Sequence, residues 1–228
     1  MTQSYSTLTG DHARLAQLLF EVGAIKFGAF KLKLHEKDPD APLSPIYLNL
    51  RTDRHPENPG PLTDEMMNLI GSLFRLMRPQ PFTRFADIPE AGAPFGDQVA
   101  RICSSNRTAV SRLTLHKIKI GGKRCITDQV DGDFDPGDTC LLIDELITHA
   151  DSKIEAISAL EKAGLRVVDV LVLVDREQGG SAQLAAAGYQ LLSVFTLGEL
   201  LNYYVECEYI DSDTADQVRT YLAANQAA

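Results

Sequence analysis

The sequence has few cysteines, no excess of basic residues and no long uncharged apolar run. Cys103, Cys125, Cys140 and Cys207 lack the spacing of a zinc site or the density of a disulfide framework, which favours a reducing, cytoplasmic compartment. Lys and Arg number 22 against 31 Asp and Glu, and the net charge of −9 disfavours binding to nucleic acid or acidic membranes. No apolar run approaches the roughly 20 residues that a membrane span needs. The first residues lack the basic start and apolar core of a secretory signal, so we expect none.

The composition is that of an ordinary globular protein, with 44% hydrophobic and 23% charged residues in 228. No repeat and no low-complexity tract interrupts the chain. This length has room for one large domain, or for one domain with a small appendage. We expect a single domain over residues 1–228 with an N-terminal addition.

Apolar residues recur at helical spacing in some segments and form short continuous runs in others. Helices are predicted over Thr9–Ala24, Leu62–Met77, Pro94–Ser104, Ser152–Ala163, Ser181–Ala187 and Asp211–Ala224. Strands are predicted over Ile46–Leu50, Phe82–Ile88, Ala109–Leu115, Thr139–Ile143, Val167–Val174 and Leu191–Phe195. Strands that alternate with helices form a parallel sheet with right-handed crossovers, so the pattern predicts an α/β doubly wound fold.

In open parallel sheets, ligands bind at the carboxyl ends of the strands. The loop after Thr139–Ile143 begins with Asp144 and Glu145 and then enters a helix. Adjacent carboxylates need a cation or sugar hydroxyls beside them, and a helix N-terminus attracts phosphate, which together indicate a sugar-phosphate site. The alternative is that the two acids flank a turn while Asp151 or Ser152 caps the helix.

A second loop, Asp175–Gly180, follows the predicted strand Val167–Val174. The planar guanidinium of Arg176 could bind a carboxylate or an imide edge through two hydrogen bonds. It could equally pair with Asp175 or Glu177 at the surface. We predict that Arg176 faces the same crevice as Asp144, because both leave carboxyl ends of neighbouring parallel strands.

Five stretches of the chain resemble the orotate phosphoribosyltransferase family, in particular the transferase domain of UMP synthase. These stretches are Phe27–Lys33, Leu43–Arg51, Pro136–Thr148, Val170–Gly180 and Leu191–Leu201. The sequence DREQGG after an apolar strand is the most specific of these signals. The resemblance extends over almost the whole chain.

This resemblance implies the type I phosphoribosyltransferase fold, with a five-stranded parallel core and a small hood from residues 1–60, in a homodimer. It also implies a reaction that transfers ribose 5-phosphate from phosphoribosyl pyrophosphate to orotate in pyrimidine nucleotide biosynthesis. The cofactor would be Mg²⁺, bound through phosphoribosyl pyrophosphate. Such an enzyme stabilises an oxocarbenium-like centre and the leaving pyrophosphate, and it excludes water.

The resemblance also assigns roles by position. Asp144 and Glu145 would hold the ribose hydroxyls, and Arg176 would bind orotate. Tyr47 and Leu48 would lie on the orotate ring. The 5'-phosphate loop would be Thr148, His149, Ala150, Asp151 and Ser152. Lys33 would reach the phosphoribosyl ligand, and Lys117 and Lys119 would serve in the catalytic loop.

The phosphate loop departs from the family pattern T-x-G-x-S. Ala150 stands at the glycine position, and Asp151 adds a negative charge. Repulsion between two unit charges about 4 Å apart amounts to ~1 kcal/mol in water and ~4 kcal/mol near a protein surface, and a dianion doubles it. Unless Asp151 points away or is neutralised, for which Lys153 is a candidate, we expect phosphate binding to be weakened. The Asp151 carboxylate can accept the loop N–H groups itself as a helix cap.

Two further departures concern the pyrophosphate. Where the family has R-K-E-x-K-D-x-G, the segment Leu113–Ile120 alternates like a strand, and its basic residues serve only if their register shifts. The turn after Phe82–Ala86 carries Asp87 and Glu90 instead of a glycine-led sequence. An insertion, His35–Ala41, lies between the hood strands. Two hypotheses therefore stand: an orotate phosphoribosyltransferase, or a catalytically silent relative that acts as a ligand-binding or regulatory dimer.

Overall fold

The computed structural model describes residues 8–31, 40–55, 57–105, 110–121 and 123–226. The chain divides into two compact units, one of residues 1–66 with 197–226 and one of residues 67–196. None of the helices among the described residues is long and apolar enough to cross a membrane. The predicted hood residues therefore share their unit with the C-terminal segment.

The second unit contains a six-stranded sheet with the order β5-β4-β3-β6-β7-β8. The strands are β3 (Arg84–Asp87), β4 (Ser111–Ile120), β5 (Lys123–Asp131), β6 (Thr139–Ile147), β7 (Arg166–Asp175) and β8 (Gln190–Thr196). Five strands are parallel to their neighbours, and β5 pairs antiparallel with β4 at the edge. The predicted parallel core is confirmed, and β5 is an additional strand that the sequence did not indicate.

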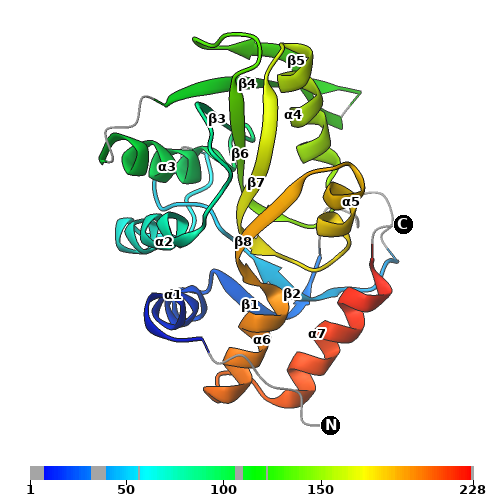
Figure 1. Ribbon diagram of the computed structural model, residues 1–228. Helices are drawn as coiled ribbons and strands as arrows, with labels where there is room; N and C mark the ends of the chain where they lie inside the picture. The colour runs from blue at the N-terminus through cyan, green and yellow to red at the C-terminus, as the bar shows by residue number, and fades with distance from the viewer. Residues whose placement is uncertain (1–7, 32–39, 56, 106–109, 122, 227–228) are drawn as a thin grey trace. The chain divides into compact units, whose positions relative to one another are not determined.

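Helices cover both faces of this sheet, as Figure 1 shows. They are α2 (Asp64–Leu76), α3 (Ala93–Ser105), α4 (Asp151–Lys162) and α5 (Gly180–Ala186). Helix α4 packs its apolar side on β6 and β7, where the core includes Ile157 and Leu160 against Leu142 and Val170. On the other face, Phe74 of α2 contacts Phe95 of α3, with ring centroids 6.3 Å apart. Burial on both faces explains why the central strands are continuous apolar runs.

The largest difference from the predicted elements is the length of β6. The strand runs to Ile147, four residues beyond the predicted end, so Asp144 lies inside the strand and not after it. The ladder to β7 continues to this point, with Ile147 opposite Asp175. The prediction ended the strand at the first charge, because a buried carboxylate is costly without a partner. A partner is present, as described below.

The first unit contains α1 (Gly10–Glu21), the antiparallel pair β1 (Ile25–Phe30) and β2 (Ser44–Leu48), and helices α6 (Leu197–Glu206) and α7 (Ser212–Ala224). Its centre is aromatic: Tyr204 is buried among Phe20, Phe27 and Tyr209, and its hydroxyl donates to the Ala16 carbonyl at 2.9 Å. Asp211 caps α7 through the Thr214 N–H. Helices α1 and α7 confirm predictions, whereas α6 was not predicted.

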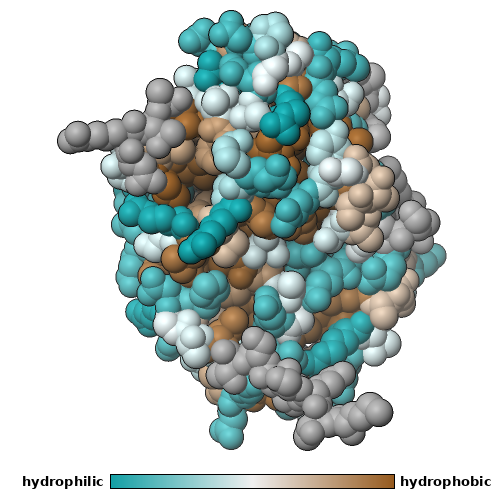
Figure 2. Space-filling model, viewed as in Figure 1, coloured by the Kyte–Doolittle hydropathy of each residue, from teal (hydrophilic) through white to brown (hydrophobic). Residues whose placement is uncertain are grey.

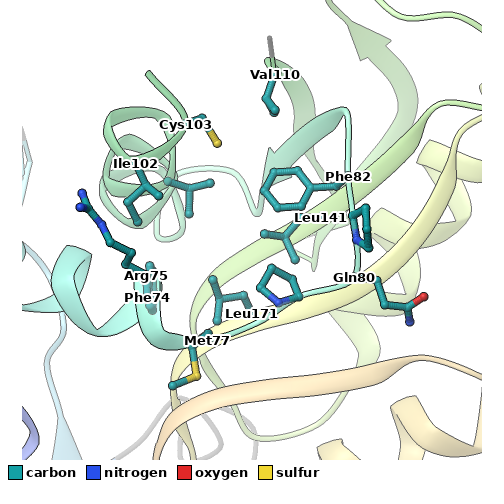
Figure 3. A pocket seen from close by; sticks show the side chains of 13 residues that line it. Phe74, Arg75, Met77, Gln80, Phe82, Ile102, Cys103, Val110, Leu141 and Leu171 are labelled. Atoms are coloured by element: carbon teal, nitrogen blue, oxygen red, sulfur yellow. The ribbon is translucent and has the colours of Figure 1, made fainter. Parts of the chain in front are cut away.

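An apolar cavity of about 380 Å³ lies in the second unit between the segment after α2, helix α3 and the sheet. Figure 2 shows hydrophobic residues at the surface between α3 and the sheet. Figure 3 shows Phe82, Leu141 and Leu171 lining this cavity. Phe82 precedes β3 and Leu141 is near the start of β6. The cavity is therefore at the amino-terminal part of these strands, away from the edge where ligands of parallel sheets bind.

Candidate active site

The acidic pair of the predicted sugar-phosphate site lies near the end of β6. Asp144 is buried, and its Oδ2 is 2.5 Å from the Lys153 ammonium of α4. The same ammonium donates to the Leu146 carbonyl at 2.6 Å, and both charged side chains are 5% exposed. In the sequence, Lys153 was a candidate to neutralise Asp151. Lys153 neutralises Asp144 instead.

The burial of Lys153 has a signal in the sequence. Lys153, Ile157 and Leu160 are spaced by four and then three residues, so they share one face of α4. That face packs on the sheet, and all three are buried. A lysine on a buried helix face needs an acidic partner, and Asp144 is that partner.

Glu145, unlike Asp144, has a carboxylate oxygen without a hydrogen-bond partner among the described residues. Burial raises the pKa of the Glu145 carboxyl well above its usual value, and the Asp144 carboxylate acts in the same direction, with Lys153 opposing. The Oε2 atom of Glu145 is buried and has no hydrogen-bond partner among the described residues. Burial and the neighbouring carboxylate therefore favour the protonated form of Glu145, and one of its oxygens is buried without a partner among the described residues.

The predicted phosphate loop bends between β6 and α4. Helix α4 begins at Asp151, its N-cap is Ala150, and no side chain caps it there. The prediction that Asp151 caps the helix is therefore wrong, and Asp151 is exposed in the first turn. Ser152 also lies in the first turn of α4, as predicted. His149 is exposed and Thr148 is half-buried.

One N–H group of this loop already has a protein acceptor. The buried Ala150 N–H donates to Oε1 of Gln183 in α5, at 2.9 Å. In the family pattern the N–H groups of this loop face the phosphate. A phosphate at Ala150 would have to replace the Gln183 carboxamide. The sequence provided no signal for this contact.

The loop after β7 packs closely against the β6 loop through its backbone. The Arg176 N–H donates to Ile147 O at 3.0 Å, and the Gly180 N–H donates to Thr148 O at 3.1 Å. A Cβ at Gly180 would lie 2.6 Å from the Ile147 side chain and 2.9 Å from Thr148 O, so only glycine fits. Arg176 is half-buried directly after β7. The backbone of Arg176 therefore lies at the carboxyl-end edge of the sheet, as predicted. It follows Val172, which pairs with Asp144 of β6, by four residues.

The two acids predicted to oppose pyrophosphate lie at the end of β3 (Asp87) and in the turn after it (Glu90), and both have arginine partners. Arg112 Nε is 2.7 Å from Asp87 Oδ2, and its Nη1 is 2.6 Å from Asp97 Oδ1. Arg124 Nη1 is 3.5 Å from Glu90 Oε2. Burial raises the pKa of Asp87, while Arg112 opposes that rise. Cations from β4 and β5 thus balance the negative charge, which the sequence did not predict.

The segment at the position of the family's basic loop forms a β-hairpin. The strand interpretation of Leu113–Ile120 is confirmed, since β4 spans Ser111–Ile120. Lys117 pairs with Ile126, and Lys119 pairs with Arg124. Both lysines are described on β4, while the side chain of Lys123 lies outside the described residues.

Helix α4 holds this hairpin. Glu155 accepts the Ile126 N–H at 3.1 Å, and Lys162 lies 2.9 Å from both oxygens of Asp128. These contacts join the middle of β5 to the helix that carries Lys153. The basic side chains therefore stand on a strand that is bound to the domain, and not on an unattached loop.

The remaining predicted residues belong to the first unit. Tyr47 and Leu48 are the last two residues of β2, and the Tyr47 ring is 5.7 Å from that of Phe30. Lys33 and residues 35–39 of the insertion lie outside the described residues. The described residues also contain no group of three or more His, Cys, Asp or Glu placed to hold a metal ion.

No family model matches the chain. The orotate phosphoribosyltransferase of Chlamydia felis is 32% identical over 206 residues, which cover 90% of this chain and 91% of that protein. The chain belongs to the orotate phosphoribosyltransferase family. Bovine uridine 5'-monophosphate synthase is also 32% identical, over 211 residues that cover 91% of this chain and 40% of the synthase. The UMP synthase of Leishmania donovani matches with a TM-score of 0.71 and 29% identity, over 94% of this chain and 43% of that chain.

The chain thus spans less than half of these UMP synthases and nearly all of the C. felis protein. Its architecture is the type I phosphoribosyltransferase fold of the family, with β5 added antiparallel at the edge of the five parallel strands. Relative to the family pattern, the loop after β7 keeps DREQGG, whereas the loop after β6 reads THADS. The orotate phosphoribosyltransferase resemblance is confirmed at the level of fold and family.

Proposed function

We propose that this protein transfers ribose 5-phosphate from phosphoribosyl pyrophosphate to orotate, producing orotidine 5'-phosphate and pyrophosphate. The supporting observation is the 32% identity that extends over 91% of the C. felis orotate phosphoribosyltransferase. In this reaction, N1 of orotate forms a bond to C1' of the ribose, and the bond from C1' to the pyrophosphate oxygen breaks. The N1 proton leaves to solvent. Mg²⁺ bound to pyrophosphate would offset the charge of the leaving group.

The residues of the two neighbouring loops have distinct roles in this proposal. Arg176 binds the carboxylate of orotate through charged hydrogen bonds. Glu145 accepts a hydrogen bond from the ribose, and the turn from Thr148 to Ser152 receives the 5'-phosphate at the N-terminus of α4. Lys117 and Lys119 on β4 supply positive charge for the pyrophosphate. Lys33, Tyr47 and Leu48 keep their proposed roles at the base.

The test is the formation of orotidine 5'-phosphate from orotate, phosphoribosyl pyrophosphate and Mg²⁺. We expect turnover with orotate and none with uracil, which lacks the carboxylate that Arg176 would bind. Product from uracil or another base, with none from orotate, would show that the acceptor is wrong. Product from neither would exclude the transferase.

A second candidate function is a catalytically silent family member that acts as a ligand-binding or regulatory dimer. The observations that favour it are the Gln183 carboxamide on the Ala150 N–H and the exposed negative charge of Asp151 at the start of α4. Calorimetric titration with phosphoribosyl pyrophosphate and Mg²⁺ distinguishes the two functions. The silent protein would release no heat of binding, whereas the enzyme would bind at micromolar concentration.

The proposal also includes a homodimer, a single functional domain over residues 1–228 and a cytoplasmic location. The resemblance to the family supports the dimer, and the scattered cysteines support the reducing compartment. Sedimentation at micromolar concentration should give twice the mass of one chain. A species with the mass of one chain would exclude the dimer.

A further inference from the structure

The two acids of the β6 site, Asp144 and Glu145, have different surroundings. Both oxygens of Asp144 have partners within the protein. Its Oδ2 accepts from the Lys153 ammonium at 2.5 Å, and its Oδ1 accepts from the Glu145 N–H at 2.9 Å. In contrast, Oε2 of Glu145 is buried without a hydrogen-bond partner among the described residues. Both oxygens of Asp144 are thus satisfied by the chain itself, whereas one oxygen of Glu145 has no partner among the described residues.

Lys153 cannot easily exchange Asp144 for a ligand. Its ammonium is held by two acceptors, Asp144 Oδ2 and Leu146 O, at 2.5 and 2.6 Å. The lysine side chain extends from the buried face of α4 and is 5% exposed. Release of Asp144 would leave a buried ammonium without its counter-ion, which is strongly unfavourable.

We infer that Lys153 is a positioning residue that fixes Asp144 inside the protein, so that Glu145 is the acid of this pair that accepts a hydrogen bond from a ribose hydroxyl. This inference rests on the proposed function, because the ribose arrives as phosphoribosyl pyrophosphate. It divides two adjacent carboxylates into one that stabilises the fold and one that meets the ligand. Lys153 acts on the ligand through Asp144, and not by contact.

The first experiment measures thermal unfolding of Lys153→Met, Asp144→Asn and the double variant. Each single variant should lower Tm by roughly 10 °C, because each leaves one buried charge or donor without its partner. The double variant should regain most of this loss, because it removes both charges. The matched control is the exposed pair Lys162–Asp128, whose side chains are 59% and 67% exposed on the same helix and the adjacent hairpin. Its Met and Asn variants should change Tm by at most about 2 °C. Additive losses in the Lys153 and Asp144 series would overturn the pairing.

The second experiment titrates the folded variants with phosphoribosyl pyrophosphate and Mg²⁺. Lys153→Met should weaken binding about tenfold, since the unpaired Asp144 carboxylate then repels the ligand. The added Asp144→Asn change should restore Kd to within about threefold of the wild type. A role of Lys153 in packing alone would not produce this restoration. A double variant that binds tenfold more weakly would show that Asp144 itself meets the ligand.

The third experiment uses Glu145→Ala, which should weaken binding of phosphoribosyl pyrophosphate at least tenfold through the lost acceptor. Unchanged binding would overturn the assignment of Glu145. If the wild type binds no phosphoribosyl pyrophosphate, the proposed function fails, and the assignment of Glu145 fails with it. The melting temperatures would still decide whether Lys153 fixes Asp144, because they do not depend on the ligand.

Discussion

The loops after β6 and β7 begin at the same edge of one sheet, but they are held in different ways. The β7 loop is positioned by its backbone, through the Arg176 N–H on Ile147 O and the Gly180 N–H on Thr148 O. In the β6 region, side chains from α4 and α5 make the contacts: Lys153 binds Asp144, and Gln183 binds the loop N–H. Backbone contacts depend little on residue type, whereas each of these side-chain contacts uses a group that the proposed ligand would otherwise contact.

This difference coincides with where the chain keeps the sequence pattern of the family and where it departs from it. The β7 loop retains DREQGG, and Gly180 is required there by the close approach of Ile147 and Thr148. The β6 loop has lost its glycine, and its free donors and acceptors are partly used by the protein. The base side of the site is therefore expected to work with ordinary affinity, and the phosphate side with reduced affinity.

The largest expected effect concerns the retained loop. Arg176→Ala should lower kcat/KM for orotate about 100-fold, because charged hydrogen bonds contribute about 1.5–3 kcal/mol. Steady-state kinetics with saturating phosphoribosyl pyrophosphate would measure this loss. The control is Arg166→Ala, an exposed arginine at the opposite end of β7, which should leave kcat/KM unchanged. Equal losses in both variants would remove the distinction between the two ends of the strand.

The next effect is a pH dependence from the β6 site. At pH values above 4.5, the ordinary pKa of a glutamate, Glu145 keeps its proton in the folded protein and loses it in the unfolded chain. The folded state then binds more protons, so the free energy of unfolding falls as pH rises, by up to about 1.4 kcal/mol per pH unit, until the raised pKa is passed. Glu145→Gln removes this slope and should gain stability over the wild type as pH rises. Urea denaturation between pH 4.5 and 8 would measure it. A constant difference across that range would mean that Glu145 is ionised in the fold.

A smaller effect is expected at Gln183, the side chain that occupies the phosphate loop. Gln183→Ala should lower the free energy of unfolding by about 1 kcal/mol, because the buried Ala150 N–H loses its acceptor. The same change should tighten binding of phosphoribosyl pyrophosphate about fivefold, since the ligand no longer competes with the carboxamide. Gln190→Ala, at an exposed position of β8, is the control and should change neither quantity. Weaker binding by Gln183→Ala would mean that Gln183 orders the loop for the ligand.

The smallest effect is expected for Asp151. Asp151→Asn should reduce stability by about 0.3–1 kcal/mol, because an acid in the first turn interacts favourably with the helix dipole. Affinity for phosphoribosyl pyrophosphate should rise a few fold at low salt and converge with that of the wild type at high salt, because the repulsion is screened. Calorimetric titration at two salt concentrations would test this. A gain that persists at high salt would contradict a purely electrostatic effect of Asp151.

The sequence alone determined the order of helices and strands, the parallel core and the family. These features depend on local apolar periodicity and on the DREQGG motif, which are legible without tertiary contacts. Helix α4 is an example: the spacing of its apolar residues predicted the helix. The ends of elements were less predictable, as β6 shows, because a charge inside a strand is tolerated only when a partner from elsewhere neutralises it.

The tertiary structure alone decided which charges in the site remain for a ligand. Asp87 and Arg112 are 25 residues apart in sequence, Asp144 and Lys153 are nine apart, and Ala150 and Gln183 are 33 apart. No local pattern indicates such pairs, because they form only when the crossover connections bring strand ends and helices together. The sequence is the same whether a carboxylate or an N–H group faces a ligand or an internal partner. Its free energy differs between these surroundings, and the fold sets that difference.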